Sequence, residues 1–174
     1  MSLLSALARA CVLAALLAVS FAAPASAQLY AAVNPADQRF ADTDVHTLAL
    51  EPGSDALEFR VPRELGKVRI MITFSAECSV AANNPDHTLY HAIKVNGRTV
   101  PPTGLRSELH YKALCSNFQG SSSQRRSVSA STTVTVEGSG NDLIRIEVQV
   151  QGLLRGGDYR VGKTSLVALV VGLL

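Results

Sequence analysis

Apolar and polar residues alternate along most of this chain, and no segment after residue 27 keeps the 3.6-residue spacing of an amphipathic helix. In the clearest segment, 67–75, the apolar residues Val68, Ile70, Ile72 and Phe74 would share one face of a strand. The same alternation, or a run of β-branched residues, predicts further strands at 45–50, 56–61, 89–95, 98–100, 127–136, 143–150 and 164–171.

Clusters of glycine, proline, asparagine and aspartate separate these segments at short intervals. The strongest turn signal is Asn96-Gly97, because a type I′ hairpin turn needs a positive φ at both central positions. Many short strands with turns between them predict an all-β fold, an antiparallel β-sandwich or jelly roll, over 45–174. The acidic stretch that precedes it makes 28–44 a flexible N-terminal arm in this interpretation.

The first 27 residues have the features of a signal peptide. A single charge, Arg9, precedes an apolar run at 12–23, Pro24 ends that run, and Ala25-Ser26-Ala27 has the small-x-small pattern of a cleavage site. We expect cleavage between Ala27 and Gln28 and a periplasmic or secreted protein. The apolar run is too short to cross a membrane, so no membrane span is expected in the mature chain. Cys11 precedes the apolar run, where a lipid-attachment cysteine would follow it.

The expected cleavage changes the number of cysteines in the protein. The sequence has three cysteines, and removal of Cys11 leaves Cys78 and Cys115. An even number of cysteines in an oxidising compartment predicts one structural disulfide between them. The alternative is a metal-binding or redox pair, which the absence of a Cys-x-x-Cys spacing disfavours.

The charge balance argues against nucleic acid as a partner. The chain has 16 Lys and Arg residues against 14 Asp and Glu. Without Arg9 the basic count becomes 15, so the mature chain is almost neutral. Nucleic-acid binding needs a clustered basic face, and the one dense basic pair, Arg125-Arg126, lies in a serine-rich loop.

Few residues suggest catalysis or a cofactor, and no cofactor is expected. His87 and His91 are four residues apart, and Glu77 lies nearby in the sequence. These three form the alternative interpretation, a metal-dependent enzyme or metal-binding module. The stretch from Gly157 to Thr164 matches the phosphate-loop pattern Gly-x4-Gly-Lys-Thr, but a β-rich apolar run follows it where a nucleotide site needs a helix.

Four short segments carry a resemblance to small exported bacterial β-sandwich proteins of unassigned function. They are Phe74-Ser-Ala-Glu-Cys78, Val95-Asn-Gly97, Cys115 and Thr164-Ser-Leu-Val167. The resemblance spans about residues 70–170, and the order of the segments is also similar to the jelly roll of the tumour-necrosis-factor and C1q families. It implies a fold and, because those families commonly pack as trimers, a homotrimer; it implies no activity.

The sequence therefore favours an exported, non-enzymatic β-sandwich protein that binds an unknown protein or glycan, or assembles with copies of itself. The apolar C-terminal strand and the Ser/Thr/Val segment 127–136 are the candidate packing surfaces, since few charges interrupt them. Tyr111 and Tyr159 are the candidate glycan contacts. The metal module of Glu77, His87 and His91 is the alternative.

Overall fold

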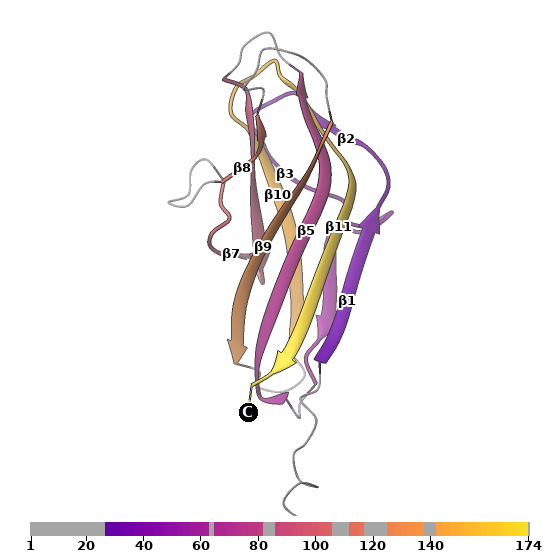
Figure 1. The fold of residues 1–174 in the computed structure, drawn as a ribbon, viewed down its shortest axis with the longest axis vertical. Helices are drawn as coiled ribbons and strands as arrows, with labels where there is room; N and C mark the ends of the chain where they lie inside the picture. Colours follow the sequence, from indigo (N-terminus) through magenta and orange to yellow (C-terminus); the bar gives the residue numbers. More distant parts are fainter. Residues whose placement is uncertain are drawn as a thin grey trace, which may run out of the picture.

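The computed structural model describes residues 27–62, 65–81, 86–105, 112–116, 125–137 and 142–173. Within these ranges the chain forms eleven strands and no α-helix, and the strands make two antiparallel sheets stacked as a sandwich (Figure 1). Sheet A contains β1 (Ala27–Asn34), β2 (Gln38–Phe40), β5 (Lys67–Ala81), β9 (Arg126–Glu137) and β11 (Asp158–Gly172). Sheet B contains β3 (Val45–Thr47), β4 (Ala56–Arg60), β6 (Thr88–Val95), β7 (Arg98–Thr99), β8 (Lys112–Ser116) and β10 (Leu143–Gly152).

The strand pairing is nested from the two ends of the chain inwards. Strands β1 and β2 pair with β11, β3 and β4 pair with β10, β5 pairs with β9, and β6 pairs with β7 and β8. The sheet orders are β1-β11-β5-β9 and β3-β10-β6-β7. One long antiparallel hairpin wrapped into two layers gives this arrangement, which is the topology of a jelly roll. The predicted fold class is confirmed.

The core lies between the two sheets and follows the predicted alternation. Val68, Ile70, Ile72 and Phe74 of β5 all have 0% exposure and face sheet B. The inward residues of β6 and β10 complete this layer, chiefly Ile93, Ile144, Ile146, Val148 and Val150. At the predicted hairpin, Asn96 and Gly97 have φ values of 49° and 78°, as a type I′ turn requires.

The segment 28–44, expected to be a flexible arm, instead contributes two strands to sheet A. All eight residues of β1 pair with β11, and β2 pairs with the start of the same strand. Inward-facing side chains hold β1 in place, because Tyr30 stacks on Phe59 with ring centroids 4.0 Å apart and Ala32 is 1% exposed. Residues 1–26 of the predicted signal peptide lie outside the described residues, and the predicted cleavage site, the Ala27–Gln28 bond, is the first bond of β1. The described residues contain no helix long and apolar enough to cross a membrane.

The predicted disulfide between Cys78 and Cys115 is present, with a Cα–Cα distance of 6.4 Å. Cys78 belongs to β5 of sheet A and Cys115 to β8 of sheet B. The bond therefore joins the two layers of the sandwich across the core.

Candidate binding surfaces

The three residues proposed as a metal site lie on different sides of the sandwich. Glu77 points outward from sheet A, where its carboxylate lies 2.7 Å from Lys163 Nζ and 3.5 Å from Arg125 Nη1. The Lys163 ammonium holds the pKa of Glu77 below its ordinary range. His91 points into the core from sheet B. No group of three histidine, cysteine or acidic side chains suited to a metal ion occurs in the described ranges.

His91 is a neutral core histidine. Its side chain is 1% exposed and lies against the Phe74 ring, with ring centroids 6.5 Å apart. Nδ1 donates to the Lys112 carbonyl at 3.2 Å, while the buried Nε2 has no partner. Burial disfavours the charged imidazolium and lowers the pKa of His91 to about 4.

His87 and Tyr159 form a buried polar contact behind the loop that precedes β11. His87 Nδ1 lies 3.0 Å from the Tyr159 hydroxyl, which donates to the Leu154 carbonyl at 2.8 Å. Burial raises the pKa of Tyr159, which has 0% exposure. The prediction that Tyr159 contacts a glycan is therefore wrong; Tyr111 lies outside the described residues.

The stretch that matched a phosphate loop lies, apart from Gly157, within strand β11. The pairing of β11 with β5 shifts register between Gly162 and Ser165, and Lys163 has a φ of 47°. These are the features of a β-bulge. A Cβ at Gly162 would collide with the carboxylate of Asp37, so that side chain would have to move. The glycine leaves room for Asp37, which lies just before β2.

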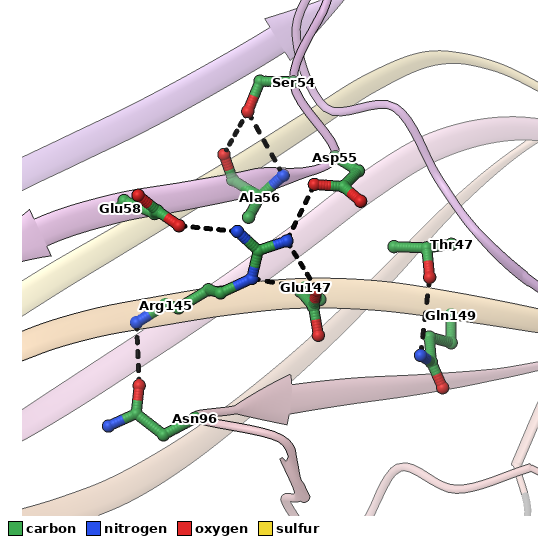
Figure 2. Close-up of polar contacts among 9 residues, drawn as sticks. All are labelled: Thr47, Ser54, Asp55, Ala56, Glu58, Asn96, Arg145, Glu147 and Gln149. Atoms are coloured by element: carbon green, nitrogen blue, oxygen red, sulfur yellow. Dashed lines mark hydrogen bonds and ion pairs between the residues drawn. The ribbon is translucent and has the colours of Figure 1, made fainter.

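The outer face of sheet B carries a charged cluster centred on Arg145 (Figure 2). The guanidinium contacts Glu58 at 2.6 Å and both Asp55 and Glu147 at 2.8 Å. The hydrogen bonds that Arg145 donates to these carboxylates, to Glu147 first, raise the pKa of Arg145. The cluster links β4 to β10. Because its charged groups are hydrated, association through this face would cost the free energy of removing that water.

The central part of the outer face of sheet A is different, because it carries little charge; the ion pairs Lys67–Glu137 and Glu77–Lys163 lie toward its two ends. Strands β1, β11, β5 and β9 lie side by side (Figure 1), and their register aligns four outward residues from each. We call these sixteen residues the sheet A face: Ala27, Leu29, Ala31, Val33, Val171, Leu169, Val167, Ser165, Arg69, Met71, Thr73, Ser75, Thr135, Thr133, Ser131 and Ser129. Arg69 is the one charged residue among them.

The composition of the sheet A face changes from apolar side chains at β1 to serine and threonine at β9. Leu29, Val33 and Met71 are 68%, 58% and 47% exposed, and these are three of the five large apolar side chains exposed in the described ranges. On the hydroxyl side, Thr73 lies within 3.3 Å of Ser131. Such pairs satisfy one another, so covering them costs less than covering hydroxyls bound only to water.

A groove lies at the open side of the sandwich, between the β6–β7 hairpin and the end of β9. It is lined by residues 95–101, except Gly97, and by residues 134–137, and its volume is about 590 Å³. Val134 and Val136 face inward from sheet A but are only half-buried. Above them the side of the sandwich is closed, since Thr132 Oγ1 donates to the Pro101 carbonyl at 2.5 Å.

Sequence reasoning identified half of the sheet A face, on β9 and β11, and missed the rest. Strand β1 carries apolar residues on both faces, so no alternation marked it as a strand. The groove has no signal in the sequence, because it arises from two segments that are separated by more than thirty residues.

No protein-family model and no curated protein matches the sequence. Among solved structures, the chain is similar to dimeric latent PorU from Porphyromonas gingivalis (TM-score 0.42, 10% identity), covering 86% of this chain and 13% of that one. The VP2 subviral particle of infectious bursal disease virus gives a TM-score of 0.43 at 11% identity, with coverage of 84% and 33%.

A family 35 carbohydrate binding module from Clostridium thermocellum gives a TM-score of 0.32 at 13% identity, covering 82% of this chain and 98% of that one. The chain therefore spans a third or less of the first two proteins. With TM-scores below 0.5, these likenesses carry no statement about function, and the family of this chain is not assigned by them.

Proposed function

We propose that this protein is an exported, non-enzymatic β-sandwich protein that assembles with a second copy of itself through the sheet A face. The observation that carries the proposal is the composition of that face, with one charged residue in sixteen positions. Exposed apolar surface of this extent is characteristic of association sites. Depletion of charge is the usual mark of the centre of an interface.

The size of the face suits a second copy. Four strands spaced about 4.8 Å apart, each presenting four outward residues, cover about 500 Å². Two such faces packed together would bury about 1,000 Å² in total, which is near the lower limit for a specific interface. Because the same patch is used on both copies, the contact is isologous and closes as a dimer. The trimer implied by the family resemblance would need two different patches.

Other features support export and a role without catalysis. A disulfide between the layers suits an oxidising compartment, and the first 27 residues suit secretion. The groups considered for metal chemistry are occupied elsewhere, with Glu77 paired to Lys163 and His91 buried in the core. A glycan partner has less support, since Tyr159, one of the two tyrosines expected to contact it, is buried.

Placing a charge at the centre of the face should prevent association. We expect the Met71→Glu variant to be monomeric at about 100 µM, and the unchanged protein to be dimeric, because two buried carboxylates would face an apolar surface. Light scattering after size exclusion, on protein produced from the full 174-residue sequence, measures both masses. The matched control is Gln149→Glu, which adds the same charge on the outer face of sheet B.

The control should keep the mass of the unchanged protein. A monomeric unchanged protein would contradict the proposal. So would an oligomer whose mass Met71→Glu does not alter, because the contact would then use another surface.

A further inference from the structure

Sheet A ends in two strands that have one neighbour each in the described residues, β1 on one side and β9 on the other. Exposed strand edges usually carry charged residues or proline, which prevent pairing with another chain. Here β1 has neither, and residues 127–136 of β9 have neither. In the described residues, both edges of sheet A therefore lack these protecting residues, and on β9 the Thr132–Pro101 hydrogen bond closes the inward side above the groove.

The direction of the strands makes these two edges compatible. Each strand along the path β1-β11-β5-β9 runs antiparallel to the next, so β1 and β9 also run antiparallel to each other. When a second copy is placed beside the first in the same orientation, its β1 lies antiparallel to β9 of the first. Such a pair forms an antiparallel ladder without either copy turning over.

The groove supplies side-chain contacts for the same pairing. Val134 and Val136 are half-buried inward residues at the lower end of β9, and Val95 and Val100 lie across the groove from them. A strand added beside β9 would place its own inward side chains against these valines. In β1 those side chains include Tyr30 and Ala32, while Leu29 and its outward neighbours would extend the sheet A face of the first copy.

We propose that the free edge of β9 and the adjoining groove bind strand β1 of a second copy, so that sheet A continues from one copy to the next. The inference rests on the proposed self-assembly, because its partner is a second copy of the chain. The contact, however, is made by the edges of sheet A and not by the sheet A face. The contact joins two different surfaces, so it repeats and gives a linear chain or a ring. It is the weaker of the two contacts and forms above the roughly 100 µM at which the face dimer is measured. Strand addition of this kind obtains affinity from main-chain hydrogen bonds and specificity from side-chain pockets.

A peptide copy of β1 tests this pairing in isolation. The protein is the full-length Met71→Glu variant, in which the face contact is removed, and the probe is a fluorescent synthetic peptide of residues 27–34. We expect saturable binding in a fluorescence anisotropy titration. A second substitution, Val136→Glu, should weaken the binding at least about tenfold, which corresponds to about 1.4 kcal/mol, whereas Gln149→Glu should leave it unchanged.

A peptide with proline at both Ala31 and Ala32 is the control for the ladder. Consecutive strand residues donate to opposite sides, so two adjacent prolines remove a donor whichever edge is used. Absence of binding to the native peptide, or equal binding of the proline peptide, overturns the inference. If circular dichroism shows that Val136→Glu does not fold, hydrogen exchange replaces it as the test. In the Met71→Glu variant that keeps Val136, the β9 amides should gain protection from exchange when the native peptide is added. Unchanged exchange overturns the inference.

These outcomes separate the two proposals. A monomeric unchanged protein that still binds the peptide contradicts assembly through the sheet A face and supports pairing at β9. If Met71→Glu dissociates the dimer and the variant does not bind the peptide, assembly through the sheet A face is supported and pairing at β9 is overturned.

Discussion

Replacing both Cys78 and Cys115 with alanine should lower the free energy of unfolding by about 4 kcal/mol. The disulfide closes a loop with a sequence separation of 37 and joins β5 of sheet A to β8 of sheet B. Without it, the unfolded chain regains the freedom of that loop. Strand β8 has five residues and pairs only with β6 in the described residues, so few other contacts replace the bond.

Thermal unfolding followed by circular dichroism measures this loss. A decrease of about 4 kcal/mol should lower Tm by roughly 10 °C in a domain of this size. Reductant should produce a similar decrease in the unchanged protein and have no effect on the double-alanine variant. If reduction leaves the Tm of the unchanged protein where it was, the disulfide is not a main source of stability.

The protein should lose about 3 kcal/mol of stability between pH 6.5 and pH 4 because of His91. In the folded state the pKa of His91 is about 4, whereas its ordinary value is 6.5. Between these pH values the unfolded state binds a proton that the folded state does not, so falling pH favours unfolding. The contribution is fully present above pH 6.5 and is lost as pH falls to 4. Lowered carboxyl pKa values, as at Glu77 and Asp158, act at lower pH.

Urea unfolding at several pH values between 4.5 and 7 measures this slope. His91→Leu replaces the imidazole with an apolar side chain, and its Nε2 has no partner to lose. We expect a flatter pH dependence in that variant and a stability at pH 7 no more than about 1.5 kcal/mol lower, since the Lys112 carbonyl loses one donor. An unchanged slope would mean that other groups carry the acid sensitivity.

Where one face of a strand is buried and the other is wet, the sequence predicted the strand well. The alternation around Ile70 and Ile72 placed the correct side chains in the core, and Asn96-Gly97 marked its hairpin. The expected alternation is lost at β1, whose outer face is entirely apolar while its inner face also carries Gln28 and Asn34. Both faces carry apolar residues there because β1 contributes to the core and to the sheet A face.

The candidate sites were harder to predict, since they depend on which strands become neighbours. Residues four apart, such as His87 and His91, are close in sequence, yet one binds Tyr159 and the other packs against Phe74. Glu77 lies in the opposite sheet and faces outward. The reverse holds for Leu29, Leu169 and Met71, which are far apart in sequence and side by side in one row of sheet A.

The place of β11 between β1 and β5 has a consequence for the time order of folding. A chain made from its N-terminus releases β11 after the other ten described strands, and β11 is the one neighbour that β1 has among them. Because the pairing is nested, the strands at the two ends of the chain pair with residues far away in the sequence. Contacts of high sequence separation are slow to form. We expect nascent chains to stay loosely folded until about residue 172 emerges, and an early stop before β11 to leave no stable product. Such a delay keeps the polypeptide in a form that can still be threaded through a pore.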